Sequence, residues 1–310
     1  MVPLLRASVS PWPATVNVVD GVLVIDKPQG LTSHDVVAAA RRALGEARIG
    51  HTGTLDPLAT GVLPLAIGRA TRLVRFLTAS DKDYDATIRF GVTTDSYDIT
   101  GAETGRTDRV PSRDALLDAV RALTGEYLQP PPAFSAKKVE GRRAYRLARQ
   151  ERPVALTPAP VRVARADLLE FTGARARVAL TCSAGFYVRS FAHSLGELTG
   201  TGACLDALRR TRSGDFTLDT AVTMDALRDP ARAAGGRVPL EALLPRFPAV
   251  TLTEQGREHV AHGREPARAD HAAAPPDAAW VRLFDTTGAL VALATPGRTP
   301  GSLHPSIVLI

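Results

Sequence analysis

The sequence predicts an α+β fold with a mainly antiparallel central sheet, followed by a smaller β-rich part at the C-terminal end. Segments with strand-like and helix-like periodicity are intermixed along the chain. They do not follow the strict strand–helix–strand alternation that is typical of a parallel sheet. The pattern also changes after about residue 246, where strand-like segments dominate. These three observations favour one α+β body and a separate β-rich unit.

The length of the chain and its change of pattern indicate the domain organisation. A chain of 310 residues is long enough for about two domains. Phe247 and Pro248 open the strand-rich region, so we place a domain boundary just before them. The expected organisation is a disordered extension at 1–17, a first domain at 18–246 and a second at 247–310.

The first half of the chain begins with an apolar run at 21–26, which is typical of a buried strand. Ser33 is expected to cap a helix over 33–44, because apolar residues recur there with a period near 3.6 and Gly45 follows as a stop signal. The elements expected next are a loop at 46–61, a strand at 62–67, a helix at 69–77, a strand at 84–92 and a polar loop at 93–112.

The second half of the first domain continues the mixture of helices and strands. Apolar periodicity predicts helices at 114–123 and 188–198, and alternation predicts strands at 161–170 and 176–182. The arginine-rich segment 204–210 is interpreted as the end of a basic helix.

Composition excludes several classes of protein. A hydrophobic content of 45% with 23% charged residues is ordinary for a folded chain and excludes a wholly disordered, collagenous or coiled-coil protein. Two cysteines, Cys182 and Cys204, are too few for a disulfide framework or a four-cysteine zinc site. No apolar run approaches the ~20 residues of a membrane helix, and the N-terminus lacks the apolar core of a signal peptide. We therefore expect a cytoplasmic protein without membrane association.

Basic residues are in excess, and the excess lies in one part of the chain. The formal net charge is +6, from 38 Lys and Arg against 32 Asp and Glu, and nearly all the cations are arginines. Codon bias in a GC-rich genome is one explanation, and an anionic partner is the other. Residues 247–310 hold five arginines and six acidic residues, so the whole excess belongs to 1–246. This position favours an anionic partner for the first domain.

The densest candidate for a site is the segment 50–61, GHTGTLDPLATG. Its three glycines permit close backbone approach, and the proline that follows Asp56 restrains that residue to an extended conformation. No Gly-Lys-Ser/Thr follows, which excludes a P-loop, and His51 and Asp56 lack a third metal ligand at a useful spacing. From the residues alone, a purely structural turn capped by Asp56 remains an alternative.

Seven ordered blocks over about residues 20–250 resemble the tRNA pseudouridine synthases of the TruB type. The blocks, besides 50–61, are GVLVIDKPQGLTS at 21–33, KDY at 82–84, TDSYDITG at 94–101, PPAFSAKK at 131–138, CSAGFYVR at 182–189 and LRRTRSG at 208–214. The resemblance implies a pseudouridine synthase fold and a small, β-rich, PUA-like C-terminal domain. It also implies an isomerase that acts on the uridine at position 55 in the T loop of tRNA after base flipping.

The resemblance implies that Asp56 is the catalytic carboxylate. The isomerisation breaks the N1–C1′ bond, turns the uracil and joins C5 to C1′, so it needs neither a redox cofactor nor ATP. An ionised carboxylate serves either as the nucleophile at the sugar or as the base at C2′, and the sequence leaves both routes open. We expect no cofactor and no metal.

Four further residues receive roles from the same resemblance. Arg189 is expected to pair with Asp56, because a carboxylate buried against a base needs a cation nearby to stay charged. Tyr84 is expected to stack on the flipped uracil, and Tyr187 to line the same pocket. His51 is expected to occupy the space that the flipped base leaves, although a role in orienting the loop stays open.

Basic residues inside the matching blocks are expected to contact RNA, although each cluster is also consistent with a solvated surface. These predicted contacts are Lys27, Lys137, Arg209, Arg210 and Arg212. The expected partner is the T-arm of tRNA, with a monomeric enzyme and no obligatory protein partner. A guide-RNA-dependent synthase and a non-catalytic tRNA-binding protein are the alternatives.

Overall fold

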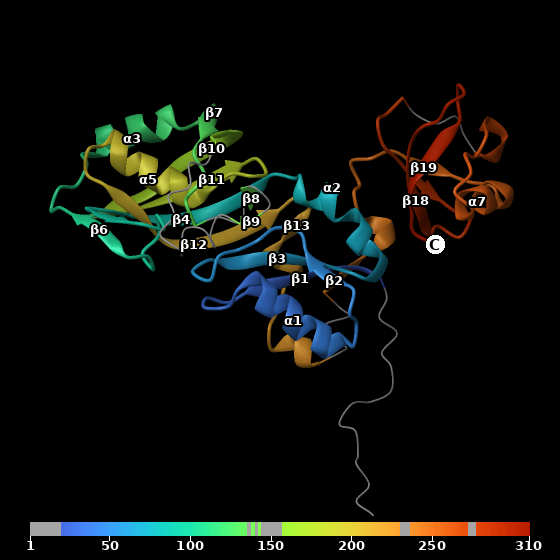
Figure 1. The fold of residues 1–310 in the computed structure, drawn as a ribbon, viewed down its shortest axis with the longest axis horizontal. Coiled ribbons are helices and arrows are strands. Elements are labelled where there is room, and N and C mark those ends of the chain that lie inside the picture. The colour runs from blue at the N-terminus through green and yellow to red at the C-terminus, as the bar shows by residue number, and fades with distance from the viewer. Residues whose placement is uncertain (1–19, 135–137, 140–141, 144–156, 230–235, 272–276) are drawn as a thin grey trace, which may run out of the picture.

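The computed structural model describes residues 20–134, 138–139, 142–143, 157–229, 236–271 and 277–310. The predicted N-terminal extension at 1–17 and the predicted RNA contact Lys137 therefore lie outside the described residues. A large sheet with helices forms the body of the molecule, and a smaller β-rich unit with its own sheet lies beside it (Figure 1).

The large sheet has eleven strands. They are β1 (Gly21–Lys27), β2 (Ile49–His51), β3 (Thr60–Ile67), β4 (Lys82–Phe90), β7 (Gly125–Gln129), β10 (Ala159–Thr172), β11 (Arg175–Cys182), β12 (Ala203–Ser213), β13 (Phe216–Thr217), β14 (Val222–Thr223) and β15 (Arg237–Pro239). The main path runs β14-β1-β3-β12-β4-β11-β10-β7, with β13 beside β12, β15 beside β1 and β2 beside β3. Among these described strands, only β1–β14 and β12–β3 pair in parallel, which confirms the mainly antiparallel sheet.

Helices cover the sheet in two separate places. The longer ones are α1 (Ser33–Leu44), α3 (Arg113–Ala122) and α5 (Val188–Leu198), and the shorter ones are η1 (Gly68–Leu73), α2 (Val74–Thr78), η2 (Leu218–Thr220), η3 (Ala226–Arg228) and η4 (Leu240–Ala242). α3 and α5 pack on β4, β10, β11 and β12 in one apolar core, and α1 packs on β1 and β3 in another (Figure 1). Tyr84 and Leu208 contact both cores, so they lie between the two helical covers.

The capping residue of α1 differs from the prediction by one position. Thr32, not Ser33, is the cap: its hydroxyl accepts a hydrogen bond from the backbone N–H of Asp35, whose carboxylate accepts one from the backbone N–H of Thr32 at 2.9 Å. The hydroxyl of Ser33 is buried and bonds elsewhere. Gly45 ends the helix with φ = 64°, as its position predicted.

The segment 204–210 forms part of strand β12, so the interpretation as a helix end was wrong. Its alanine, leucines and arginines are good helix formers, which misled the prediction. β12 lies between β3 and β4 and pairs with both, and this pairing overrides local propensity.

Smaller differences concern the loops. The expected loop at 46–61 contains β2, and the expected loop at 93–112 contains the hairpin of β5 (Val92–Thr94) and β6 (Glu103–Arg106). The helix predicted at 69–77 is divided into η1 and α2, whereas the helix predicted at 188–198 is confirmed by α5. Two short strands, β8 (Lys138–Val139) and β9 (Arg142–Arg143), pair with each other.

The C-terminal unit is built on a four-stranded sheet in the order β16-β17-β18-β19. Its elements are β16 (Ala249–Thr251), α7 (Glu254–Ala261), η5 (Arg268–Asp270), β17 (Val281–Phe284), β18 (Leu290–Pro296) and β19 (Leu303–Val308). Phe76 of α2 packs edge-on against Phe247 and Trp280, with ring centroids 5.6 and 4.7 Å apart, and so joins this unit to the body. Within the described part of the chain, no helix has the length and apolarity needed to cross a membrane.

Candidate active site

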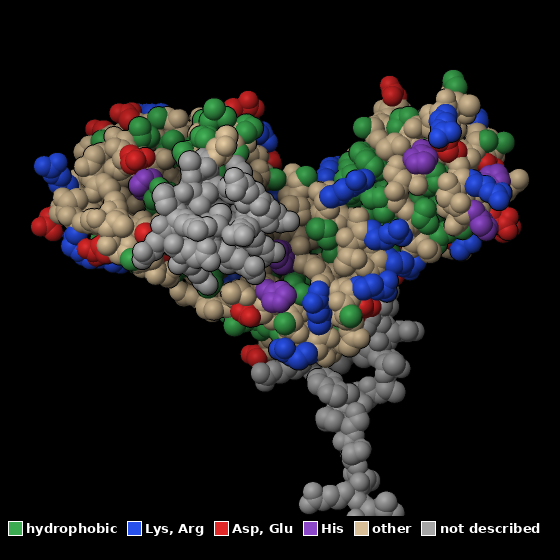
Figure 2. All heavy atoms as spheres, viewed as in Figure 1, with side chains coloured by type: hydrophobic (Ala, Val, Ile, Leu, Met, Phe, Trp, Pro, Cys, Tyr) green, Lys and Arg blue, Asp and Glu red, His purple; other side chains and the backbone are tan. Residues whose placement is uncertain are grey.

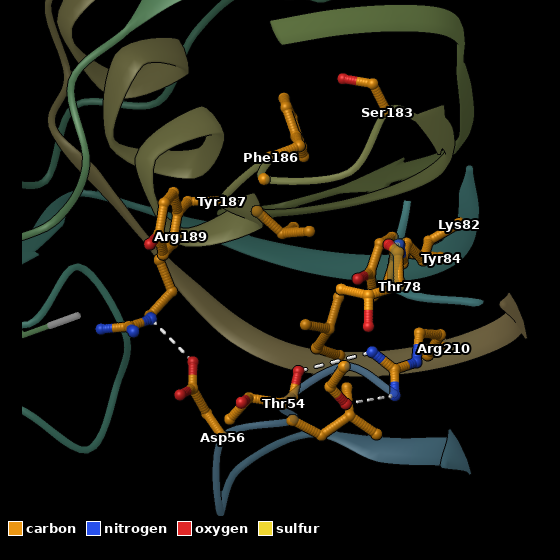
Figure 3. Close-up of a pocket in the computed structure, with 15 residues that line it drawn as sticks. Thr54, Asp56, Thr78, Lys82, Tyr84, Ser183, Phe186, Tyr187, Arg189 and Arg210 are labelled. Carbon is orange, nitrogen blue, oxygen red and sulfur yellow. Dashed lines mark hydrogen bonds and ion pairs between the residues drawn. The ribbon is translucent and has the colours of Figure 1, made fainter. Parts of the chain in front are cut away.

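A cavity of about 360 Å³ is lined by residues of several elements (Figure 3). The loop between β2 and β3 brings Asp56 to it, β4 brings Tyr84, α5 brings Arg189 and β12 brings Arg210. Its lining comprises Gly53, Thr54, Leu55, Asp56, Thr78, Lys82, Tyr84, Ser183, Gly185, Phe186, Tyr187, Val188, Arg189, Leu208 and Arg210. Segments that are far apart in the sequence thus converge on one side of the sheet.

Asp56 and Arg189 form an ion pair at the mouth of this cavity. Arg189 Nε lies 2.9 Å from Asp56 Oδ2, and the side chain of Arg189 is 8% exposed against 41% for Asp56 (Figure 3). The other two guanidinium nitrogens donate to the carbonyls of Ser96 (3.0 Å) and Phe134 (2.9 Å), and Asp98 Oδ2 lies 3.8 Å from Nε. Arg189 is therefore fixed on all sides, while Asp56 keeps a surface that faces the cavity.

Asp98 was not predicted as a site residue, although it stands in the block 94–101. It is 6% exposed, and a buried carboxylate needs charged or hydrogen-bonding partners. Its side chain accepts from Thr100 N at 3.0 Å, and its carbonyl accepts from the Thr94 hydroxyl at 2.7 Å. This loop thus holds a second carboxylate beside Arg189. Only the position of Asp98 within a matching block signalled it in the sequence.

The loop that carries Asp56 is anchored to α1 and to the turn after β1. The buried hydroxyl of Ser33 accepts from Leu55 N at 2.8 Å and donates to Leu55 O at 3.0 Å. The backbone N–H of Gly30 donates to the carbonyl of Pro57 at 2.8 Å. The residues on both sides of Asp56 are therefore held, which fixes the direction of its carboxylate.

Arg210 braces the same loop from the sheet. It is 1% exposed and donates to the carbonyls of Val62 (2.7 Å), Gly53 (3.1 Å) and Thr54 (3.4 Å) (Figure 3). β3 approaches β12 so closely at this point that a Cβ on Gly61 would lie 2.2 Å from the carbonyl oxygen of Arg210. Glycine is thus required for the contact that places Arg210 under the loop.

Two tyrosines also line the cavity. Tyr84 lies opposite Arg210 in the β4–β12 register, and burial raises the pKa of its hydroxyl while the charge of Arg210 opposes that rise. Tyr187 stands at the start of α5, where the side chain of Gln129 accepts from Tyr187 N at 2.8 Å and donates to Tyr187 O at 3.0 Å. Gln129 was not singled out in the sequence, because nothing in its surroundings marked it.

Two buried lysines lie close to the cavity. Lys27 donates to the carbonyls of Pro28 (2.9 Å) and Leu31 (2.6 Å), and burial lowers its pKa to about 8 although Asp56 opposes that shift. Lys82 lines the cavity and donates to the carbonyl of Thr78, and burial lowers its pKa to about 8 as well. Lys82 was known only as part of a matching block and received no role from the sequence.

Other predicted residues lie away from the cavity lining. His51 is on β2 and is not among the residues that line the cavity. Arg209 forms a bidentate ion pair with Asp26 at 3.1 and 2.8 Å, and Arg212 forms one with Asp83 at 2.7 and 2.8 Å. The structure therefore brings together Asp56, Tyr84, Tyr187, Arg189 and Arg210, and it separates His51, Lys27, Arg209 and Arg212 from the lining.

The polar lining is rich in cations and hydrogen-bond donors rather than in metal ligands. Within the described ranges, no three His, Cys, Asp or Glu side chains gather as they do around a metal ion. The cavity joins one partly exposed carboxylate with two buried guanidinium groups and two phenol rings. Such a site suits a flat, uncharged ring attached to an anionic chain.

Comparison with solved structures defines the class of fold. Over 94% of this chain and 86% of the other, the chain is similar to a structure of the archaeal box H/ACA sRNP Nop10-Cbf5 complex, with a TM-score of 0.70 and 25% identity. A Cbf5-Nop10-Gar1 complex gives a TM-score of 0.71 and 27% identity over 94% and 85% of the two chains. The predicted α+β pseudouridine synthase fold with a C-terminal β domain is thereby confirmed.

Sequence comparisons then define the family. The model of the N-terminal domain of TruB family pseudouridylate synthases matches residues 41–188, and the model of the tRNA pseudouridylate synthase B C-terminal domain matches 189–245. A tRNA pseudouridine synthase B from Solibacter usitatus (strain Ellin6076) is 45% identical over 94% of this chain and 100% of its own length. One from Mycobacterium sp. (strain KMS) is 44% identical over 86% and 92%. The chain belongs to the TruB family of pseudouridylate synthases.

Proposed function

We propose that this protein is a tRNA pseudouridine synthase that isomerises the uridine at position 55 in the T loop. The Asp56–Arg189 ion pair at the mouth of a cavity that is large enough for a base carries the proposal. The names of the relatives, tRNA pseudouridine synthase B, support tRNA as the substrate. The part of the tRNA that binds is the T-arm, and the reaction uses no cofactor.

Asp56 supplies the charged oxygen that the isomerisation requires. The N1–C1′ bond of uridine breaks, the detached uracil turns, C5 forms a bond to C1′, and the proton on C5 is lost while N1 gains one. The carboxylate either attacks the sugar or removes a proton from C2′. Both routes need it held against the ribose, and the anchored loop and Arg189 hold it there.

The remaining residues of the lining bind and orient the base. Tyr84 stacks on the flipped uracil, which contributes roughly 1–3 kcal/mol towards the cost of unstacking it from the RNA. Tyr187 bounds the cavity on the side of α5. His51 fills the space in the RNA that the flipped base leaves. Of the exposed predicted contacts, Arg209 and Arg212 pair with aspartates in the free protein, and their contact with RNA stays a prediction.

The enzyme acts alone, as a monomer in the cytoplasm. The similar solved structures contain Cbf5 together with Nop10, and one of them also contains Gar1. The curated relatives with the higher identity are named as tRNA enzymes, which favours a substrate bound directly over one presented by a guide RNA. The C-terminal unit has the size and β-rich build of a PUA-like domain, and we assign residues 247–310 to it.

Replacement of Asp56 by Asn tests the proposal. The variant keeps the shape of the side chain but removes its charge, so tRNA affinity stays within a few-fold while pseudouridine formation falls by at least about 10³-fold. Release of tritium from tRNA labelled at C5 of uridine measures the reaction directly. Asp118→Asn is the matched control, because Asp118 is exposed on α3 and forms a surface ion pair with Arg121.

Two outcomes would contradict the proposal. If Asp56→Asn releases tritium at the rate of the unchanged protein, Asp56 is not the reacting carboxylate. If the unchanged protein binds tRNA but releases no tritium, the protein is a binding or folding factor instead of an isomerase.

A further inference from the structure

Three exposed arginines gather where the C-terminal unit meets the body. They are Arg72 of η1, Arg75 of α2 and Arg246, which precedes β16. Figure 2 shows Lys and Arg side chains collected along this junction. Within the part of the chain that the structure describes, none of the three has a carboxylate within 4.0 Å. We name Arg72, Arg75 and Arg246 the junction arginines.

The junction arginines are held by neutral groups, so they keep their charge. The guanidinium of Arg75 lies over the rings of Phe76 and Trp280, with its central carbon 4.7 and 5.0 Å from the centroids. Arg246 donates to Phe76 O at 3.0 Å and to the Ser80 hydroxyl at 3.1 Å. Stacking and carbonyl bonds restrict a guanidinium without neutralising it, and a stacked fork keeps its N–H groups available for a phosphate.

Arg72 extends this surface towards the last strand of the C-terminal unit. Its guanidinium donates to the carbonyl of Val308 in β19, which lies across the junction from η1. The three cations are therefore tied to both sides of the junction and do not depend on either unit alone.

Several other exposed arginines of the molecule are instead paired with carboxylates. Arg177 on β11 donates through two nitrogens to the carboxylate of Asp85 on β4. Arg175 on β11 donates through Nε to the carboxylate of Asp206 on β12, at 2.8 Å. An aspartate cancels each of these charges locally, so they attract a polyanion much less than an uncompensated guanidinium does.

The junction arginines are continuous with the active-site cavity. Arg75 and Thr78 both belong to α2, a helix of five residues, and Thr78 lines the cavity. Ser80, which bonds Arg246, lies between Thr78 and Lys82, another residue of the lining. A nucleic acid whose base enters the cavity therefore passes within reach of this surface.

We propose that the junction arginines bind the backbone phosphates of the paired stem next to the loop whose uridine enters the cavity. This inference rests on the proposed function, because it takes the occupant of the cavity to be a nucleotide of a folded RNA. Guanidinium forks contact phosphate oxygens without reading sequence, so the surface positions the stem rather than selecting it.

Salt dependence of RNA binding by a triple variant tests the proposal. Arg72→Gln, Arg75→Gln and Arg246→Gln are combined, and tRNA affinity is measured over a range of salt concentrations. The plot of log affinity against log salt becomes shallower by about two to three units, and affinity near physiological salt falls on the order of tenfold. Arg177→Gln is the matched control, since it removes one arginine whose charge is already paired, and its affinity changes by less than about twofold.

A variant in which all three junction arginines are replaced by lysine distinguishes a loss of charge from a folding defect. Lysine keeps the charge but not the fork, so the slope of the salt plot remains close to that of the unchanged protein. A lysine variant that loses as much slope as the glutamine variant would overturn the proposal. An unchanged slope in the glutamine variant would also overturn it, as would a loss of slope in Arg177→Gln of the same size.

Activity on a short hairpin separates this inference from the proposed function. The hairpin keeps the loop but has only the first base pairs of the stem. If the proposed function holds, both the unchanged protein and the glutamine variant form pseudouridine in it at similar saturating rates. If neither protein modifies any RNA, the proposed function fails, and the salt plots still decide whether the junction arginines bind phosphates.

Binding to vesicles that contain anionic lipid tests a membrane as the partner instead. If the glutamine variant binds RNA as the unchanged protein does but is no longer retained on the vesicles, the surface binds a membrane and the proposal is overturned.

Discussion

The two faces of the large sheet are built from the same strands but use their charges differently. On β4 and β12, Tyr84 and Arg210 turn to the cavity, while the adjacent Asp83 pairs with Arg212. Successive residues of a strand point to opposite faces, which separates Asp83 from Tyr84, and a register shift between Arg210 and Arg212 places Arg212 beside Asp83. Neighbouring arginines in this sequence therefore do not form one functional group.

The arginines of the two faces differ in the groups to which they donate hydrogen bonds. Arg189 and Arg210 are buried and donate mainly to backbone carbonyls of loops that form the cavity. Arg212 and Arg209 are partly exposed and pair with aspartates, Arg212 with Asp83 on the neighbouring β4 and Arg209 with Asp26 on β1, beyond β3. Removal of a buried charge leaves its partners unsatisfied, whereas water replaces the partner of an exposed one. The cavity face should therefore be far more sensitive to substitution.

Arg189→Ala should have the largest effect. It leaves Asp56 without its cation and Asp98 buried without a charged neighbour, so turnover falls by about 10²–10³-fold while tRNA affinity falls much less. Single-turnover rates at saturating enzyme and equilibrium binding measure the two effects separately. Arg177→Ala removes an arginine from the other face and serves as the control. Equal losses of rate and affinity would instead indicate that Arg189 contacts a phosphate.

Gly61→Ala should destabilise the protein through the cavity face without changing any charge. The new Cβ meets the carbonyl of Arg210 at 2.2 Å, and the backbone has φ = 98°, which L side chains rarely adopt. We expect a loss of about 2–4 kcal/mol in the free energy of unfolding. Gly173→Ala is the matched control: it also has a positive φ, 57°, but nothing lies within 4 Å of its Cβ, so it loses about 1–2 kcal/mol. If urea unfolding shows the same loss of free energy for both variants, the close contact between β3 and β12 at Gly61 adds no cost to the backbone strain.

The buried Lys27 gives the cavity side of the sheet a pH dependence that can be isolated. Burial lowers its pKa to about 8, from 10.5, so the folded state binds fewer protons than the unfolded state between these values. Its contribution to the free energy of unfolding therefore rises with pH across that window. Lys27→Met lacks this rise. The free energy of unfolding of the variant, compared with that of the unchanged protein, is therefore highest below pH 8 and falls as the pH increases to 10.5.

Only the difference between the two proteins is diagnostic in that experiment. Lys82 and the buried Cys182, whose pKa is raised to about 12 by burial, titrate in overlapping ranges but are present in both proteins. The lost donors to Pro28 O and Leu31 O shift the variant's stability equally at every pH. Unfolding curves that stay parallel from pH 7 to 10.5 would show that Lys27 keeps its ordinary pKa.

Local patterns predicted the parts of this molecule that depend on neighbours in the sequence. Apolar periodicity placed α5, and the block around Asp56 marked the loop that the structure brings to the cavity. Long-range pairing was not visible: the segment 204–210 looked helical until β3 and β4 paired with it. Asp56 was expected as a partner of Arg189, but its other two close partners were missed for the same reason, since they are backbone carbonyls whose position depends on the fold.

Charge was the least predictable feature, because a sequence shows which residues are basic but not what compensates them. Arg209 and Arg212 stand in a basic run, yet their aspartates lie on β1 and β4, far away in the chain. The junction arginines are scattered among apolar residues in the sequence, and none of them was predicted as an RNA contact. Compensation across strands, and not the density of arginines along the chain, decides which of them keep their charge.

The smallest effect is expected for the Arg212–Asp83 pair, and it measures what the other face of the sheet contributes. In a double-mutant cycle of Arg212→Met and Asp83→Asn, the coupling free energy in urea unfolding should be about 0.2–1 kcal/mol, because both side chains are about one-third exposed. High salt should reduce it further, since exposed pairs are screened. A coupling of several kcal/mol that resists salt would mean that this face behaves like the cavity face. The contrast between paired surface arginines and buried cavity arginines would then no longer explain which charges the enzyme needs.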